Sequence, residues 1–286
     1  MPKSLEITVQ ATRRSKLLGS VLTHAILIIG GIVFIVPFMW MILTSFKSLS
    51  ESMLVPPVIF PAILHWSNYA SALTTLPFVQ FYENTVLMTI GRTVGQLVFC
   101  SLAAYAFARI EFPGRNLLFL LTLSVLMIPS YVFLLPQYMI MKNLGWLNSV
   151  QALIVPGLFS SFGTFLLRQY FMSLPLELDE AAKIDGANHL QIYWHVILPL
   201  VKPALIALAI FTILWSWNDL MWPLVVNSSS DKMTLSVGLA TLQGEYFTNF
   251  PVLMAGAVLA TWPMLLMFIC LQRYFVEGIA LTGSKG

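Results

Sequence analysis

Long runs of apolar residues alternate with shorter polar segments along this 286-residue chain. An α-helix needs about 20 consecutive apolar residues to cross the hydrocarbon core of a membrane. Six segments come close to that length or exceed it, so the pattern predicts an all-α membrane protein with six transmembrane helices. The predicted helices are residues 21–43, 85–107, 117–139, 153–171, 204–226 and 252–271.

Local features bear on three of these predicted helices. The first is too long for the apolar region of a signal peptide and lacks a small-residue cleavage site, so we expect it to be retained. The third contains Pro129 and Pro136, which free backbone carbonyls and can kink a helix. Polar residues and Arg168 dilute the fourth, but Gly157 and Ser161 have the four-residue spacing that lets membrane helices pack closely.

Composition agrees with a membrane protein, because 58% of the residues are hydrophobic and only 9% are charged. Soluble domains have about 25% charged residues. The net charge of +3 gives no reason to expect a nucleic-acid partner. Cys100 and Cys270 lie inside apolar runs, which favours packing over a disulfide or a metal pair. No metal-ligand spacing is present among the histidines, which are His24, His65, His189 and His195.

The positions of Lys and Arg predict the orientation of the chain, since cytoplasmic segments are enriched in both. Six helices with both termini in the cytoplasm place eleven of the fifteen basic residues on that side. These are Lys3, Arg13, Arg14, Lys16, Arg109, Arg115, Arg168, Lys183, Lys202, Arg273 and Lys285. Lys47, Lys142 and Lys232 fall outside, and Arg92 lies within the second helix. The predicted organisation is therefore a cytoplasmic segment (1–20), a transmembrane domain (21–271) and a cytoplasmic tail (272–286).

The cytoplasmic segment 173–203 carries the densest run of charged, helix-forming residues, and we predict a helical hairpin there. Pro175 suits the first turn of a helix, and the acidic residues after it suit the positive end of the helix dipole. Gly186 suits a left-handed cap at the end of this helix. Asn188 and Gln191 have the spacing of a capping box that begins a second helix.

The second helix of this hairpin is predicted to be amphipathic and to end at Leu198-Pro199. Four apolar residues have the spacing of one helical face. They are Leu190, Tyr193, Trp194 and Ile197.

Part of the hairpin resembles a known family. Glu180-Ala181-Ala182 is followed after three residues by Gly186, and after nine more by Val196-Ile197-Leu198-Pro199. This arrangement is similar to the EAA loop of bacterial ATP-binding-cassette (ABC) importer permeases, which usually have Ile at the position of Val196.

The resemblance covers most of the chain from about residue 34 and extends to the carbohydrate-uptake branch of that family. Within this branch the chain resembles the smaller, six-helix permease subunits of maltose transporters. The segments that carry this resemblance are AYAFAR (104–109), WNDLMWPL (217–224), TLSVGL (234–239) and RYFVEG (273–278).

The resemblance implies a type I ABC importer permease in the bacterial cytoplasmic (inner) membrane. Such a subunit moves a mono- or oligosaccharide, or a related polyol, by alternating access. The implied partners are a second related permease subunit, two ATP-binding subunits that hold ATP and Mg²⁺, and an extracytoplasmic solute-binding protein that the 227–250 segment contacts. The 173–203 hairpin would dock on an ATP-binding subunit. The residues assigned to this coupling are Glu180, Ala181, Ala182, Asp185, Gly186, Leu198 and Pro199.

Polar and aromatic residues within the predicted helices are candidates for a substrate pathway. A carboxylate such as Asp219 costs about 2.5–3.5 kcal/mol at the centre of a transmembrane helix, so it is expected to face a cavity or a partner. It suits the hydroxyl groups of a sugar, but it could equally brace the helices by pairing with Arg92. Tryptophans are also enriched at membrane interfaces without any ligand. The candidates are Asn84, Gln137, Trp215, Trp217, Asn218, Asp219 and Trp222.

No catalytic residue is expected in this chain, because no nucleophile, base and orienting group can be assembled from the sequence. The chain also lacks a G-x-x-x-x-G-K-[ST] phosphate loop, so we expect ATP hydrolysis on partner subunits. The alternatives are a permease for glycerol phosphate or another solute, a secondary transporter that works alone, and an intramembrane enzyme. Apart from Arg168, which is counted on the cytoplasmic side, only Arg92 lies within a predicted helix as a binding group for phosphate, which favours a neutral cargo.

Overall fold

The computed structural model describes residues 3–244 and 248–283, and it describes side chains for residues 19–244 and 248–272. Some predicted features therefore lie outside the described residues or side chains. They are most of the segment 1–20, the tail with its 273–278 motif, part of the 227–250 segment, and the basic residues Lys3, Arg13, Arg14, Lys16, Arg273 and Lys285.

The described residues form helices and no β-strand, which confirms the predicted all-α class. The chain divides into two compact units. Unit 1 comprises Met1–Ala72 and Glu245–Leu259, and unit 2 comprises Leu73–Gly244 and Ala260–Gly286. Helices α3 (Ser67–Thr75) and α15 (Phe250–Gly283) have residues in both units.

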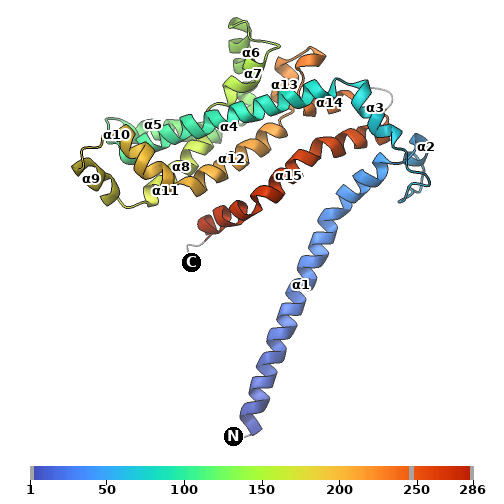
Figure 1. The fold of residues 1–286 in the computed structure, drawn as a ribbon, viewed down its shortest axis with the longest axis horizontal. Coiled ribbons are helices and arrows are strands. Elements are labelled where there is room, and N and C mark those ends of the chain that lie inside the picture. The colour runs from blue at the N-terminus through green and yellow to red at the C-terminus, as the bar shows by residue number, and fades with distance from the viewer. Residues whose placement is uncertain (1–2, 245–247, 284–286) are drawn as a thin grey trace. The chain divides into compact units, whose positions relative to one another are not determined.

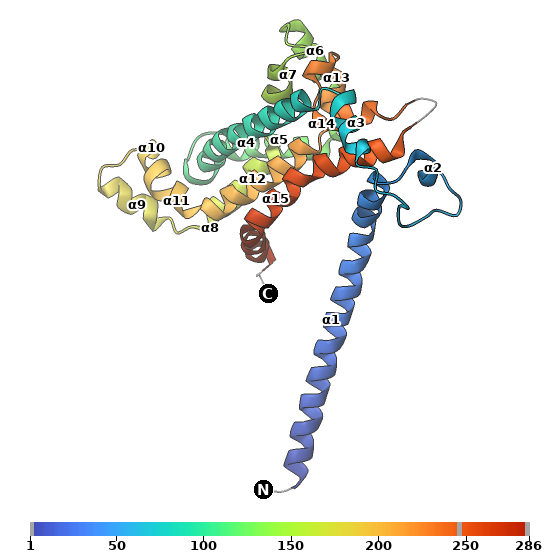
Figure 2. The same cartoon turned by 45° about the vertical axis from the view of Figure 1, so that its right-hand side comes forward.

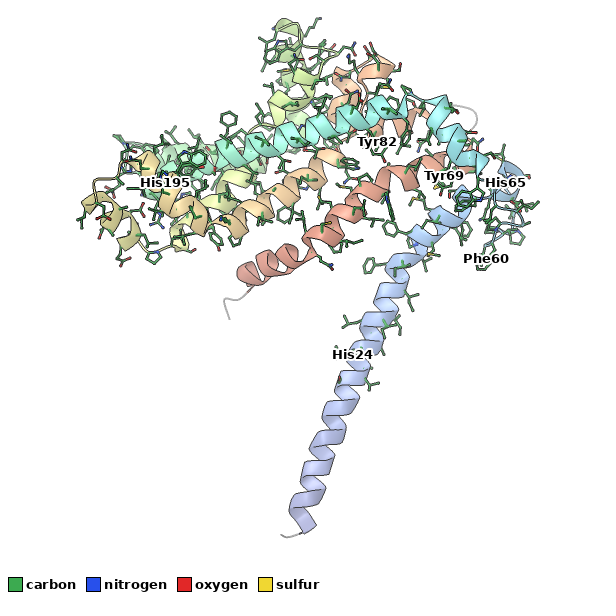
Figure 3. The ribbon with its side chains drawn as sticks, in the orientation of Figure 1. His24, Phe60, His65, Tyr69, Tyr82 and His195 are labelled. Carbon is green, nitrogen blue, oxygen red and sulfur yellow. The ribbon has the colours of Figure 1, made fainter. Side chains whose placement is uncertain are left out.

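Unit 1 contains α1 (Lys3–Ser45) and the short helix α2 (Leu49–Ser52). From Gly19 on, the apolar side chains of α1 are largely exposed, as on a helix that faces lipid. After α1, Tyr69 Oη lies 2.8 Å from Ser45 Oγ (Figure 3). Lys47 is buried, and its Nζ donates to Val58 O at 2.6 Å and lies 4.2 Å from the centre of the Trp40 ring. These contacts replace the water that the Lys47 ammonium group loses on burial. Burial also lowers the pKa of this group.

Three helices form the centre of unit 2. They are α4 (Phe78–Arg109), α8 (Ser161–Ser173) and α12 (Lys202–Trp217), which lie side by side (Figure 1). Glycines permit the close approach. A Cβ atom at Gly157 would lie 2.6 Å from the Arg92 side chain, and one at Gly163 would lie 2.9 Å from Leu208. The close packing predicted at Gly157 is confirmed.

Apart from its part of α15, the other elements of unit 2 are short. Helices α9, α10 and α11 lie at one end of α4, and α6, α7 and α13 lie well away from that end (Figures 1 and 2). The bounds are α5 (Arg115–Ser124), η1 (Val125–Met127), η2 (Ser130–Phe133), α6 (Leu134–Asn143), α7 (Val150–Ile154), η3 (Val155–Gly157), α9 (Glu177–Ile184), α10 (His189–Gln191), η4 (Ile192–Ile197), α11 (Leu198–Leu200), α13 (Met221–Val226), η5 (Ser230–Lys232) and α14 (Leu235–Thr241).

Four helical stretches of the described chain are long and apolar enough to cross a membrane, or up to six if each of two bent helix pairs counts as one span. The four stretches are Gly19–Ser45, Phe78–Arg109, Val150–Ser173 and Phe250–Gln272. They contain the predicted first, second, fourth and sixth helices.

The prediction of one continuous helix over 117–139 is wrong. The stretches Arg115–Met127 and Ser130–Asn143 meet at an angle of 102°. Ile128 is extended, with φ −95° and ψ 127°, as expected for a residue before proline. The predicted kink is thus confirmed at Pro129. The prediction of a second kink at Pro136 is wrong, because Pro136 lies in the first turn of α6, where a helix needs no backbone N–H donor.

The prediction of one continuous helix over 204–226 is also wrong. Helix α12 ends at Trp217, and α13 begins only at Met221. A continuous helix would bring the ring of Pro223 against the carbonyl of Asp219, four residues earlier. The break before α13 removes this clash. At its other end, α12 is bent by 79° from the His189–Leu200 stretch.

We predict that Gly95→Leu destabilises the protein by about 1–3 kcal/mol, the usual cost of overpacking. A Cβ atom at Gly95 collides with the Leu158 side chain and would also lie 3.1 Å from the backbone Cα of Leu158. The melting temperature of the detergent-purified protein measures the effect. Gly30→Leu is the control, because nothing lies within 4 Å of a Cβ atom at Gly30. Equal melting temperatures for the two variants would contradict the prediction.

Candidate functional site

A cavity of about 490 Å³ lies in unit 2, beside the break at Pro129 and the break before α13. One wall comes from η2 and α6, after the break at Pro129, and the other comes from the break before α13. Backbone that is not helical is tolerated at membrane depth only where it is buried in protein or lines a watery cavity. The lining residues are Ser130, Tyr131, Leu134, Gln137, Asn218, Asp219, Leu220, Met221 and Trp222.

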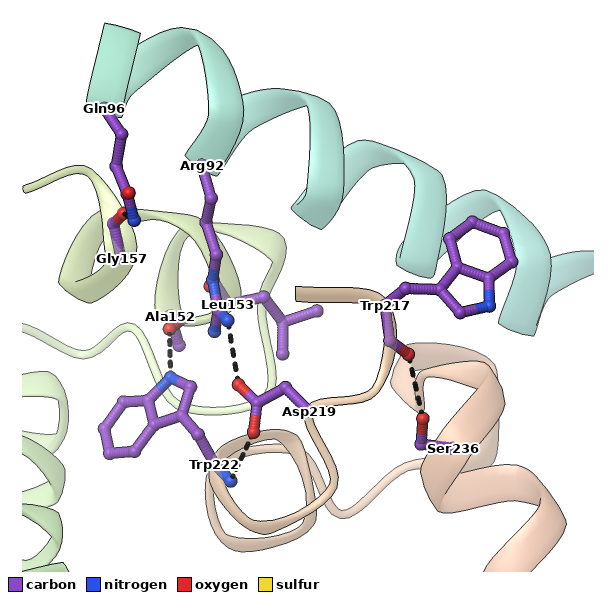
Figure 4. A network of polar contacts seen from close by, with 9 residues as sticks. All are labelled: Arg92, Gln96, Ala152, Leu153, Gly157, Trp217, Asp219, Trp222 and Ser236. Atoms are coloured by element: carbon purple, nitrogen blue, oxygen red, sulfur yellow. Dashed lines mark hydrogen bonds and ion pairs between the residues drawn. The ribbon is translucent and has the colours of Figure 1, made fainter. Parts of the chain in front are cut away.

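Asp219 joins this cavity to the centre of unit 2 (Figure 4). Its Oδ2 accepts a hydrogen bond from Arg92 Nη1 at 2.8 Å, and its Oδ1 accepts a long one of 3.4 Å from the backbone N–H of Trp222. The Arg92 side chain is 10% exposed and that of Asp219 is 23% exposed. The pair neutralises both charges where an isolated one would be costly, and it leaves the carboxylate in contact with the cavity.

The Arg92 side chain also holds α7 next to α4. Its Nε donates to Leu153 O at 2.7 Å. Trp222 Nε1 donates to the preceding carbonyl of α7, Ala152 O, at 2.8 Å. Both carbonyls lie at the end of α7, where the helical hydrogen bonds run out. Arg92 and Trp222 therefore fix α7 to α4 and to the cavity wall (Figure 4).

Gln96 makes a similar connection one turn further along α4. Its Nε2 donates to Gly157 O at 2.9 Å, and its Oε1 accepts from Thr212 Oγ1 at 2.9 Å. Gln96 thereby ties α4 to η3 and α12. Sequence reasoning missed this residue, although a buried amide inside an apolar run was a signal that could have drawn attention to it.

Four of the seven predicted pathway residues line one cavity, and three lie elsewhere. Gln137, Asn218, Asp219 and Trp222 are brought together from segments about 80 residues apart. The amide of Asn218 also donates to its own helix, at Leu214 O.

The other three pathway candidates do not reach this cavity. Asn84 donates to the carbonyls of Asp231 and Met233, at 2.9 and 3.0 Å. Trp217 is buried and donates to Ala260 O at 3.1 Å. Trp215 is about half exposed and packs against phenylalanine rings.

Sequence reasoning missed several lining residues, namely Ser130, Tyr131, Leu134, Leu220 and Met221. The signal for the first two was Pro129, since a break at that residue turns the following residues out of the helix.

At the C-terminal end of α4, the predicted hairpin is confirmed in its main features. Helix α9 ends at Ile184, and Gly186 has φ +85°, the left-handed conformation that favours glycine. Asn188 and Gln191 form the predicted capping box, with hydrogen bonds of 2.8 and 2.9 Å. Pro175 lies before α9 and not within its first turn.

Two predictions about the second helix of the hairpin are wrong. It passes through Pro199 and ends at Leu200, and only Tyr193 and Ile197 of the predicted apolar stripe are buried. Leu190 and Trp194 are 59% and 53% exposed. The reason is the π-helical turn η4, in which the backbone N–H of Leu198 bonds to Tyr193 O, five residues earlier. This wider turn places Ile192 and Ile197, five residues apart, on the buried face, and Pro199 lies at the start of α11.

The residues assigned to coupling lie on or near the surface of this hairpin. Five of them are exposed, namely Glu180, Ala181, Asp185, Gly186 and Pro199. Ala182 and Leu198 are half-buried against the core cluster between the hairpin and α4. Four large apolar side chains around them are uncovered, which is typical of a docking surface. They are Leu176 (62% exposed), Ile184 (87%), Leu190 (59%) and Trp194 (53%).

Among the described residues, no three His, Cys, Asp or Glu side chains gather as a metal site. His195 lies on η4, and its Nδ1 is 3.1 Å from Gln191 O (Figure 3). Cys100 is buried and Cys270 is exposed, and neither forms a disulfide.

The sequence matches the family described as "Binding-protein-dependent transport system inner membrane component" over residues 96–280. A permease protein of an arabinooligosaccharide transport system, AraQ of Halalkalibacterium halodurans, is 39% identical over 87% of this chain and 91% of its own length. The diacetylchitobiose uptake permease NgcG of Streptomyces coelicolor is 33% identical over 91% of this chain and 87% of its own. The sn-glycerol-3-phosphate permease UgpE of Yersinia enterocolitica is 32% identical over 90% and 94%.

The fold is also similar to that of a solved structure. A chain of a bacterial ABC transporter involved in the import of the acidic polysaccharide alginate superposes with a TM-score of 0.80 and 25% sequence identity. The match covers 92% of this chain and 98% of the other.

We predict that Asp219→Ala lowers the melting temperature because it leaves Arg92 buried without its carboxylate. Breaking a fully buried pair costs about 3–5 kcal/mol, and we expect less here because Asp219 is partly exposed. Adding Arg92→Met should recover part of the loss, since the unpaired charge is then removed.

The control for this prediction is Asp231→Ala, whose ion pair with Lys232 is solvent-exposed and should contribute little. The melting temperatures of all variants are compared in detergent. Losses that simply add in the Arg92→Met, Asp219→Ala variant would show that the two side chains do not stabilise each other.

Proposed function

The chain belongs to the binding-protein-dependent transport system inner membrane components, and from this membership we propose that it is the permease subunit of an ATP-driven importer for a neutral sugar or polyol. It is a multi-pass protein of the inner membrane. The observation that carries the choice of cargo is the chemistry of the cavity at the two helix breaks.

The lining of this cavity suits a neutral, hydroxylated cargo. Gln137 and Asn218 offer amides, Asp219 offers a carboxylate, and Tyr131 and Trp222 offer aromatic rings. Amides and carboxylates bind hydroxyl groups, and aromatic faces stack on the C–H surfaces of sugar rings. None of the described lining residues is Lys, Arg or His.

Glycerol phosphate is the second candidate, because UgpE relatives match over most of the chain. The charge of the site argues against it. The nearby cation, Arg92, is already bound to Asp219, and Asp219 itself would repel a phosphate group. An anionic cargo would require a cation from another subunit.

The hairpin is the proposed contact with the ATP-binding subunits, which would hold ATP and Mg²⁺. The uncovered apolar side chains on and around α9, together with the exposed Glu180 and Asp185, support this role. The name of the family supports a solute-binding protein as a further partner. A second, related permease subunit completes the proposed assembly, and the 227–250 segment contacts the binding protein.

Substitutions in the cavity should reduce uptake without loss of assembly. We predict that Gln137→Ala and Asn218→Ala each lower the rate of uptake about tenfold, which corresponds to about 1.4 kcal/mol, the loss of one hydrogen bond. Uptake is measured in vesicles with arabino-oligosaccharide, diacetylchitobiose and sn-glycerol 3-phosphate. Asn143→Ala, an exposed amide at the end of α6, is the control. Uptake of glycerol phosphate alone would refute the proposed cargo.

The hairpin prediction uses a glycine substitution. Gly186→Ala places a side chain where φ is +85°, at a cost of about 1–2 kcal/mol, and should weaken co-purification of an ATP-binding subunit. Gly145→Ala is the matched control, because Gly145 has φ +68° and lies between α6 and α7. Pull-down from mild detergent, with mass spectrometry, measures the partners. Equal recovery from both variants would show that the hairpin is not the docking site.

A further inference from the structure

Arg109 lies where three elements of unit 2 meet. It is the last residue of α4, and the chain beyond it is extended at Ile110. Its guanidinium group reaches the C-terminal end of α8 and the first turn of α9, the helix that begins the hairpin. The Arg109 side chain is 1% exposed and that of Asp179 is 9% exposed.

Four hydrogen bonds fix this guanidinium group. Nη2 donates to Phe171 O at 2.6 Å and to Leu174 O at 2.8 Å. Nη1 donates to Asp179 Oδ2 at 3.0 Å and to Pro175 O at 3.3 Å. A single side chain thus holds one carbonyl in the last turn of α8, the carbonyls of Leu174 and Pro175 just after it, and a carboxylate in the first turn of α9.

Both helix ends favour this arrangement. The last carbonyls of α8 carry the negative end of the helix dipole, which attracts a cation. Asp179 lies in the first turn of α9, at the positive end of that helix. The planar, five-donor guanidinium group can bind both at a fixed angle, and a lysine ammonium group cannot. Arg109 therefore sets the direction of α9 relative to α8 and α4.

Helix α4 carries a second arginine–aspartate pair near its middle. Arg92 binds Asp219 at the cavity, and Arg109 binds Asp179 at the hairpin. The two arginines are separated by about 25 Å along one continuous helix, from a rise of about 1.5 Å per residue. A movement of the hairpin that displaces Asp179 therefore pulls on the helix that also anchors the cavity wall.

We propose that Arg109 is a positioning residue that transmits movement of the hairpin along α4 to the cavity, through its ion pair with Asp179. The inference rests on the proposed function, because it requires an ATP-binding subunit docked on the hairpin. It adds a route inside this chain by which hydrolysis elsewhere changes the cavity.

The test measures ATP hydrolysis and uptake together, in vesicles that contain the whole transporter. Arg109→Gln and Asp179→Asn should keep the ATP-binding subunit bound and keep hydrolysis within about twofold of wild type. The amount of cargo moved per ATP should fall about fivefold or more, the usual size of a coupling effect. Arg109→Lys keeps the charge without the forked geometry and should fall between these variants and wild type.

The matched control is Arg115→Gln. Arg115 lies six residues further along the chain, and its Nη1 donates locally, to Ile110 O at 3.3 Å. Its substitution should leave the amount of cargo moved per ATP unchanged. Should Arg109→Gln fail to accumulate in membranes, Asp179→Asn decides the question, because it leaves the guanidinium group on its three carbonyls.

The outcomes separate the two claims. A parallel fall in hydrolysis and uptake, with an unchanged ratio, would overturn the inference and leave Arg109 with a purely structural role. An unchanged ratio with unchanged rates would overturn it as well. Absence of any ATP-binding subunit from the wild-type complex would instead refute the proposed function on which the inference rests.

Discussion

A backbone carbonyl or N–H group without a partner costs several kcal/mol in an apolar environment, and unit 2 meets this constraint at its interrupted helices with side chains from α4. Arg92 binds Leu153 O, Gln96 binds Gly157 O, and Cys100 Sγ lies 3.4 Å from Ser160 O. Arg109 continues the series at the end of α8. Helix α4 thus supplies side-chain donors to backbone carbonyls of the segment 153–174.

This arrangement explains why charged and polar residues are placed inside an apolar helix. Arg92, Gln96 and Cys100 each bind a carbonyl of the 150–173 stretch, and Arg92 also binds Asp219, which lines the cavity. The Arg92–Asp219 pair shows that bracing and lining are not exclusive alternatives. Its carboxylate neutralises a buried arginine and also faces the cavity. A helix that is anchored at both its middle and its end is also a stiff connection between the cavity and the hairpin.

Local signals in the sequence were sufficient for features that depend on a few neighbouring residues. The left-handed Gly186, the capping box of Asn188 and Gln191, and the break at Pro129 were all predicted, because each follows from the backbone preferences of the residues themselves. The apolar stripe of the second hairpin helix was not, because the π turn changes the helical period and no residue type signals such a turn. With this turn, Ile192 and Ile197, five residues apart, both lie in the core.

The sequence by itself determined the all-α class, the apolar segments and the hairpin, since segment length, caps and prolines act within one turn or one span of the chain. Only the tertiary structure decided which polar residues share a site. Asp219 meets Arg92 across 127 residues of sequence, whereas Asn84 binds the carbonyls of Asp231 and Met233 and takes no part in the cavity. In the sequence, the amide of Asn84 and the carboxylate of Asp219 look alike, because each is a polar group within or directly beside a predicted helix. Their partners differ because helix packing brings distant carbonyls to one side chain and leaves another facing a cavity.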